Sequence, residues 1–135
     1  MTDNVLIKVE NLKKHYTGGV VKALDGINCE IKKGEVVVIV GPSGSGKSTF
    51  LRSLNLLEIP TSGKIFFDGT DITDKKTNIN HHRQRMGMVF QHFNLFNNKT
   101  VMGNMILAPI QLKLKTKEQA IADAEKLLQR IGLLD

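Results

Sequence analysis

The chain has 135 residues, within the size range of a single domain, and 41% hydrophobic with 24% charged residues is the balance of an ordinary globular protein. Lys and Arg number 19 against 13 Asp and Glu, giving a formal charge of +6, but these basic residues are scattered rather than gathered in one run. With no Trp and only 5% aromatic residues, the sequence offers no stacking platform for nucleic acid. Nucleic-acid binding is therefore disfavoured, and a mixed, solvated surface is the simpler interpretation.

The sequence also bears on the cellular compartment in which the protein works. Cys29 is the only cysteine, so no disulfide can form within the chain, and a reducing, intracellular setting is expected. Asp3 stands where a secretory signal peptide would need positive charge. The apolar run at residues 36–40 is far too short to span a bilayer. If the protein works at a membrane, we expect it to sit on a partner that spans it.

The N-terminal part of the sequence predicts antiparallel strands. Residues 5–12 alternate apolar and polar side chains, and residues 27–31 continue this pattern after a turn at Gly18 and Gly19. Cys29 alternates with apolar neighbours and is expected on the core face with them. The unbroken β-branched run at residues 36–40 then predicts a strand buried on both faces of a parallel sheet.

A Gly-rich turn follows this run, and apolar residues at helical spacing predict a helix over residues 47–57. Residues 64–67 and 86–90 predict two short strands on either side of a polar stretch. Thr116 begins a capping box, which predicts a helix over residues 117–131. The sequence stops just after this helix, whose apolar face has little left to pack against. We therefore expect a truncated part of a domain.

The Gly-rich turn satisfies the Walker A pattern G-x-x-x-x-G-K-[ST] between a predicted strand and a predicted helix. Gly44 and Gly46 can adopt backbone conformations that other residue types rarely adopt. These conformations turn successive N–H groups toward anionic oxygens. We expect Lys47 at the β- and γ-phosphates of a nucleotide, Ser48 at Mg²⁺, and Thr49 at the α-phosphate. The residues predicted to hold the phosphates are Gly41, Pro42, Ser43, Gly44, Ser45, Gly46, Lys47, Ser48 and Thr49.

Walker A alone does not separate kinases, GTPases, helicases and transport motors. Here two antiparallel strands precede the loop, and Gly87-Met88-Val89-Phe90-Gln91 follows it after another strand and a polar stretch. With Phe93-Asn94-Leu95-Phe96 and Thr100-Val101 behind it, this order resembles the Q-loop region of ABC transporter ATPases over essentially all 135 residues. The ATP-binding subunits of polar amino acid importers look most similar. ATPases of methionine import, export and cell division share much of the pattern.

The resemblance implies an α/β fold with a P-loop (RecA-like) core, an N-terminal antiparallel β subdomain and the start of a helical subdomain near Gln91. Residues 1–135 would be the N-terminal part of a single nucleotide-binding domain that contains the A-loop, Walker A and Q-loop. An LSGGQ-type signature and a Walker B strand do not occur in these 135 residues. The chain as given is therefore expected to bind nucleotide without turning it over.

The resemblance also implies roles for two further residues. Tyr16 matches the A-loop position, where an aromatic ring stacks on adenine, and Gln91 matches the Q-loop glutamine, whose amide can coordinate Mg²⁺ and orient water. Lys47 and Gln91 become the catalytic candidates, Ser48 and Gln91 the metal ligands, and ATP and Mg²⁺ the cofactors. From the residues alone, Tyr16 could instead cover its own strand, and Gln91 could be a polar turn residue.

The implied function is ATP binding and, in the complete protein, ATP hydrolysis that energises import of polar amino acids at the cytoplasmic face of the cell membrane. The implied partners are transmembrane permease subunits, a second ATPase subunit in a head-to-tail homodimer and, indirectly, an extracytoplasmic substrate-binding protein. Phe93, Leu95 and Phe96 are expected to dock a helix of the permease. Two alternatives stay open: a nucleotide-binding module without turnover, and a basic P-loop protein associated with nucleic acid.

Overall fold

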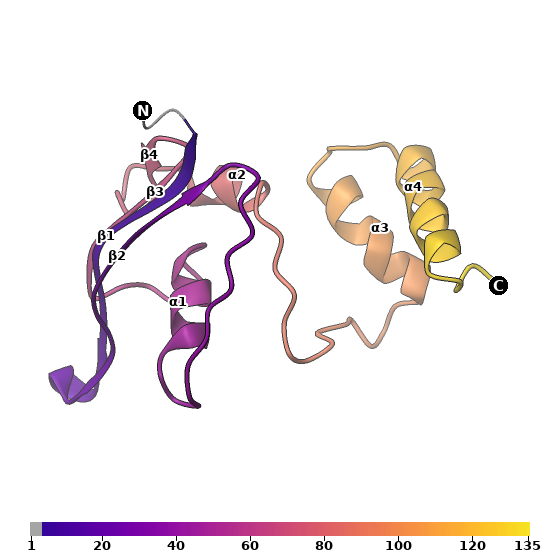
Figure 1. The fold of residues 1–135 in the computed structure, drawn as a ribbon. Helices are drawn as coiled ribbons and strands as arrows, with labels where there is room; N and C mark the ends of the chain where they lie inside the picture. The colour runs from indigo at the N-terminus through magenta and orange to yellow at the C-terminus, as the bar shows by residue number, and fades with distance from the viewer. Residues whose placement is uncertain (1–3) are drawn as a thin grey trace. The chain divides into compact units, whose positions relative to one another are not determined.

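The computed structural model describes residues 4–135, which divide into two compact units on either side of the boundary between Met88 and Val89. The first unit contains the strands and two short helices, and the second contains two longer helices (Figure 1).

The first unit is built on a four-stranded antiparallel sheet with the strand order β2-β1-β3-β4 (Figure 1). Its strands are β1 (Val5–Tyr16), β2 (Val21–Lys32), β3 (Ser62–Phe67) and β4 (Thr70–Asp71). A 3₁₀ turn at Thr17–Gly19 joins the first two strands, as predicted for Gly18 and Gly19. The two antiparallel N-terminal strands are thus confirmed. Both are longer than predicted, because irregularities in β1 interrupt the alternation on which the prediction rested.

One of these irregularities lies where β1 pairs with β3. The register shifts between Glu10 and Lys13, and Asn11 has a positive φ of 47°. At this point β3 brings Gly63 against the neighbouring backbone. A Cβ at Gly63 would lie 2.4 Å from the carbonyl oxygen of Asn11 and 2.7 Å from the Cα of Leu12. The close approach of the two strands therefore requires glycine at position 63.

The core of the first unit lies on one face of this sheet, under the helix α1 (Lys47–Ser53). Phe50 and Leu54 pack against a cluster of buried side chains contributed mainly by the strands. That cluster consists of Val9, Leu12, Leu24, Ile65, Phe67 and Ile72. Burying each of these aliphatic or aromatic side chains contributes about 1.5–3 kcal/mol before the entropy of folding is set against it. The same packing holds α1, the Walker A helix, in place.

The helix α1 is shorter than the predicted span of residues 47–57. Leu56 has a positive φ of 58°, which takes the chain out of the helical path. Arg83 then satisfies carbonyl groups beyond the helix, donating from Nε to the Asn55 oxygen at 2.9 Å and from Nη2 to the Leu56 oxygen at 3.0 Å. Arg83 ends a second helix, α2 (Ile79–Arg83), which the polar composition of this stretch concealed. The only local signal for α2 is the N-cap residue Asn78.

Two predicted strands are wrong. Residues 36–40 and 86–90 have no regular secondary structure. The exposed fractions of Val36, Val38 and Val40 are 90%, 77% and 84%, so the β-branched run is not a buried strand. The β-branched residues favour a strand, but a parallel strand also needs neighbouring strands that supply its hydrogen bonds. The four strands of the described sheet pair with one another, and none of them pairs with residues 36–40.

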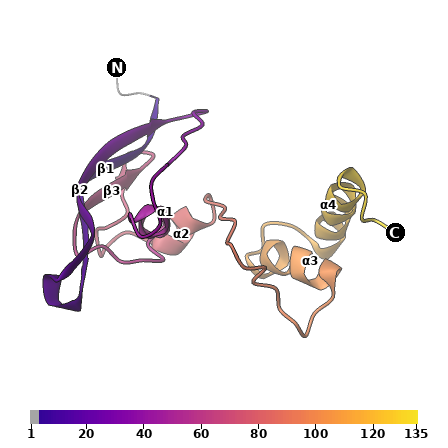
Figure 2. The same cartoon turned by 60° about the horizontal axis from the view of Figure 1, so that its bottom comes forward.

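The second unit contains α3 (Val101–Gln111) and α4 (Lys117–Arg130), which lie side by side (Figure 2). The predicted capping box at Thr116 is confirmed: its Oγ1 accepts from the Gln119 N–H at 3.2 Å, and the Gln119 side chain accepts from the Thr116 N–H at 3.1 Å. The buried face of α4 is formed by Ala120, Ala124 and Leu128. None of the helices between residues 4 and 135 is long and apolar enough to cross a bilayer.

Candidate nucleotide-binding site

The Walker A loop connects the exposed segment 36–40 to the first residue of α1. Gly44 and Gly46 have positive φ values of 81° and 94°, the backbone conformation expected of glycines that turn the chain tightly. A Cβ at Gly46 would lie 2.3 Å from the carbonyl oxygen of Ala23 on β2. The loop therefore presses directly on the sheet, and position 46 accepts no side chain without displacing one of the two backbones.

The side chain of Lys47 folds back over its own loop. Its ammonium group donates to the carbonyl oxygens of Gly41 at 2.5 Å and Pro42 at 2.8 Å, and to the Ser45 hydroxyl at 3.2 Å. These three oxygens lie on the loop that is predicted to surround phosphate. A positive charge is thus placed where charge-assisted hydrogen bonds to phosphate oxygens would form.

The remaining Walker A residues differ in how far they are exposed. Gly41, Pro42, Ser43, Gly44 and Ser45 are exposed, as a loop that meets a ligand from solvent must be. Ser48 is also exposed, in the first turn of α1, so its hydroxyl is free of core packing. Thr49 is half-buried. The structure therefore brings the predicted residues of the loop and of the first helical turn together on one side of the first unit.

Tyr16 ends β1 and is half-buried. The pKa of its phenol is raised, first by desolvation and then by a hydrogen bond to the Glu58 carboxylate, while the Thr49 hydroxyl acts in the opposite direction. The Tyr16 hydroxyl therefore lies close to both Glu58 and Thr49. The fold brings the predicted adenine-facing residue to a residue of the predicted phosphate site, although the two are far apart in the sequence.

Two residues that sequence reasoning missed lie next to Tyr16. Lys14 places its Nζ 5.0 Å from the centroid of the Tyr16 ring, and the same atom forms an ion pair with Glu58 at 3.1 Å. The pKa of Glu58 is lowered, first by the hydrogen bond from Tyr16 and then by Lys14. Neither residue belongs to a motif, and their proximity depends on the return of the chain from α1 to the sheet.

Gln91 lies in the second unit, in the irregular segment before α3, and its side chain is exposed. Its predicted contacts with Mg²⁺ and water stay a prediction. The same segment carries three exposed apolar side chains, Phe93, Leu95 and Phe96, with exposed fractions of 94%, 60% and 56%. Asn104 of α3 holds this segment, because its side chain accepts from the Phe96 N–H at 2.8 Å and donates to the Phe96 carbonyl oxygen at 3.2 Å.

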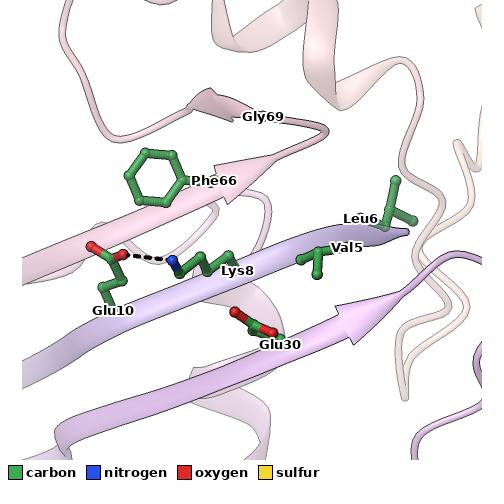
Figure 3. A pocket seen from close by; sticks show the side chains of 7 residues that line it. All are labelled: Val5, Leu6, Lys8, Glu10, Glu30, Phe66 and Gly69. Atoms are coloured by element: carbon green, nitrogen blue, oxygen red, sulfur yellow. Dashed lines mark ion pairs between the residues drawn. The ribbon is translucent and has the colours of Figure 1, made fainter. Parts of the chain in front are cut away.

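Two cavities of the first unit differ in their relation to the Walker A loop. The larger, of about 420 Å³, is bounded by the loop and the inner side of β2. Its lining includes Leu24, Ile27, Cys29, Val37, Ile39, Ser45, Gly46, Lys47 and Phe50. The smaller, of about 280 Å³, lies on the strands away from the loop and contains the ion pair of Lys8 with Glu10 at 3.2 Å (Figure 3). The cavity beside the loop is mostly apolar, and burial there raises the pKa of the Cys29 thiol.

Comparison with known proteins decides the family. Residues 24–135 match the family described as ABC transporter. The chain belongs to this family. The match includes the Walker A loop and Gln91, so the resemblance drawn from the sequence is confirmed, and with it the expected fold class.

Among curated ABC relatives, the glutamine transport ATP-binding protein GlnQ of Bacillus subtilis is 49% identical over 130 residues, which cover 96% of this chain and 53% of that protein. The arginine transport ATP-binding protein ArtM of the same organism is 50% identical over 130 residues, with the same coverage of 96% and 53%. The chain thus spans about half the length of the curated relatives it matches.

Solved ABC structures are similar to this chain in fold. The dimeric structure of a bacterial ABC transporter cassette superposes with a TM-score of 0.79 and 36% identity over 92% of this chain and 56% of that one. CbiO1 of Clostridium perfringens, part of the ABC transporter complex cbiONQ, gives a TM-score of 0.74 and 35% identity over 96% of this chain and 51% of that one. The antiparallel sheet, the Walker A helix and the helical unit are therefore parts of an ABC ATPase cassette.

Proposed function

We propose that this chain provides one face of an ATP site and that, in the whole protein, ATP hydrolysis at this site energises the import of polar amino acids. The observation that carries the proposal is the Walker A loop, which is pressed on β2 at Gly46 and holds the Lys47 ammonium over its own oxygens. Family membership supports ATP as the nucleotide.

The residues of the loop fit a phosphate chain. Glycines at positions 44 and 46 leave backbone N–H groups accessible, and Lys47 supplies a point charge for the β- and γ-phosphates. The exposed Ser48 hydroxyl is a hard oxygen ligand of the kind that Mg²⁺ accepts alongside phosphate oxygens, and Thr49 is assigned to the α-phosphate. Bound Mg²⁺ would neutralise charge on the phosphates. Gly41, Pro42, Ser43 and Ser45 complete the wall of the phosphate site.

Two side chains extend the site beyond the phosphates. Tyr16 is proposed to stack on adenine, which is supported by the influence of the Thr49 hydroxyl, a group of the phosphate site, on the pKa of its phenol. Gln91 is proposed to coordinate Mg²⁺ and to orient the attacking water, a role that rests on its position in the family pattern. Lys47 and Gln91 are the proposed catalytic residues of the whole protein.

The proposal of amino acid import rests on what the relatives are named for, glutamine transport and arginine transport. It places the whole protein at the cytoplasmic face of the membrane, bound to permease subunits and paired head to tail with a second ATPase subunit. An extracytoplasmic substrate-binding protein would deliver the amino acid to the permease. Phe93, Leu95 and Phe96 form the surface proposed to contact the permease.

The test is uptake of radiolabelled amino acids by vesicles that contain the full-length protein and its permease. Uptake of a polar amino acid should require internal Mg²⁺ and ATP and should stop in the Lys47→Ala variant. Uptake of methionine alone would assign the protein to another import system. ATP-dependent expulsion with no uptake would contradict the import proposal.

A further inference from the structure

Lys14 is held in a fixed position at the end of β1. Its ammonium group donates to the carbonyl oxygen of Ile59 at 2.7 Å and pairs with Glu58 at 3.1 Å. The exposed fractions of the two side chains are 17% for Lys14 and 26% for Glu58, so both are largely withdrawn from solvent. Partial burial makes this pair less subject to screening by salt than a surface ion pair.

The segment that carries Glu58 is itself fastened to β1. The Thr61 N–H donates to the Lys13 carbonyl oxygen at 2.8 Å, and the His15 N–H donates to the Thr61 hydroxyl at 2.9 Å. These bonds lie on either side of Lys14 in the strand. Glu58 and Lys14 are therefore fixed relative to each other by backbone contacts and not only by their charges.

The Tyr16 ring is restrained by Lys14, whose position Glu58 fixes in turn. The Lys14 ammonium lies 5.0 Å from the ring centroid, within the range of a cation–π contact, and it covers one face of the ring. Glu58 pairs with the same ammonium at 3.1 Å, and its lowered pKa keeps the carboxyl ionised at neutral pH. A flat base can then stack only on the face of the ring opposite Lys14.

We propose that Lys14 and Glu58 are positioning residues that fix the Tyr16 ring for the adenine of ATP, an inference that rests on the proposed nucleotide site. Lys14 determines which face of the ring is available, and Glu58 holds the Lys14 ammonium in that position through their ion pair. The pair would then contribute to binding of the base and not to binding of the phosphates. This separates it from an ion pair that merely stabilises the fold.

The experiment compares two ligands on the full-length protein by calorimetry, Mg-ATP and Mg-tripolyphosphate, which lacks the base. Lys14→Met and Glu58→Gln should each weaken ATP binding about threefold to tenfold, with tripolyphosphate binding unchanged. Lys14→Arg should bind ATP as tightly as the wild type, because a guanidinium also stacks on an aromatic face. Lys22→Met removes the same charge from an exposed position on β2 and is the matched control. Binding of tripolyphosphate also shows that each variant is folded.

The Tyr16→Ala variant distinguishes failure of the adenine role of Tyr16 from failure of the positioning role of Lys14 and Glu58. If it leaves ATP affinity unchanged, the adenine role of Tyr16 is wrong, and the positioning role falls with it. If it weakens ATP binding while Lys14→Met and Glu58→Gln do not, only the positioning role is overturned. Equal losses for ATP and tripolyphosphate would also overturn it, in favour of a structural ion pair. In the Tyr16→Ala background, Lys14→Met should have no further effect on ATP affinity, and an undiminished effect there would contradict the inference.

Discussion

The Nζ atom of Lys47 lies 2.5 Å from the carbonyl oxygen of Gly41, at the opposite end of the Walker A loop. Each charge-assisted hydrogen bond of this ammonium to phosphate is worth about 1.5–3 kcal/mol. Lys47→Ala should therefore weaken Mg-ATP binding roughly ten- to a hundredfold. Calorimetry on folded full-length protein measures the change, and Lys22→Ala serves as the control for loss of charge. Equal ATP affinities before and after Lys47→Ala would show that the phosphate site lies elsewhere.

The Tyr16 ring should contribute to the affinity for nucleotide through its flat face. Tyr16→Ala should cost about 1–3 kcal/mol of binding free energy, the range found for stacking of a base on an aromatic side chain. Tyr16→Phe retains the ring beneath Lys14 and should keep most of the affinity. Fluorescence titration with a labelled ATP analogue measures both variants. An unchanged dissociation constant in the Ala variant would leave Tyr16 as a side chain that only covers its strand.

The exposed surface formed by Phe93, Leu95 and Phe96 should bind the permease. A charged side chain cannot be buried cheaply in such a contact, so Phe93→Asp or Phe96→Asp should abolish amino acid uptake and preserve ATP binding. Reconstituted vesicles measure the expected loss of uptake, and calorimetry on the same preparations measures the ATP binding that should be preserved. Leu114→Asp, which also adds a charge at an exposed apolar position, is the control. Normal uptake by both Phe variants would remove the docking role.

Asp68 should make the stability of the protein depend on pH in the acid range. Its pKa is lowered, first by its hydrogen bond from Arg85 at 3.0 Å and then by Lys33 at 3.3 Å. Because the folded pKa lies below the unfolded one, Asp68 stabilises the fold above the unfolded pKa of about 4, and this stabilisation is lost as the pH falls through the folded pKa.

The variant Asp68→Asn tests this linkage, because Asn also tolerates the positive φ of 50° at this position. Urea unfolding should show the variant to be less stable than the wild type near pH 7, with the difference shrinking below about pH 4. Glu30→Gln, which removes an exposed carboxylate from β2, should show a smaller difference. A gap between Asp68→Asn and the wild type that stayed constant down to about pH 2 would exclude Asp68 as its source.

The 135-residue chain should bind ATP without turning it over. In-line attack by water needs a water-orienting group and an acid that holds the metal, and the proposed residues Lys47, Ser48 and Gln91 do not include that acid. A phosphate-release assay on purified 1–135, beside the same chain with Lys47→Ala, measures turnover. Multiple turnovers in the first and none in the second would mean that another acid, such as Asp68 or Asp71, performs this role.

The parts of the structure that were predictable are those encoded locally. The Walker A pattern around Lys47 and the capping box at Thr116 consist of neighbouring residues, and their geometry follows from φ preferences and short-range hydrogen bonds. The segment 36–40 was predicted wrongly because a strand depends on its partners in the sheet, which the segment does not itself contain. Lys14 and Glu58 were missed for a related reason, since only the return of the chain from α1 brings them together.

The contact of Gly63 with the backbone of β1 also bears on how the sheet assembles. A slip of β3 by one residue would place Ser62 or Lys64 where a Cβ lies 2.4 Å from the Asn11 carbonyl oxygen. Such a slip would also turn Ile65 away from the core, so sterics and burial penalise the same misfolded pairings. During folding, Gly63 therefore excludes slipped alignments of β3. The surface on which the Walker A helix rests is completed in a single register.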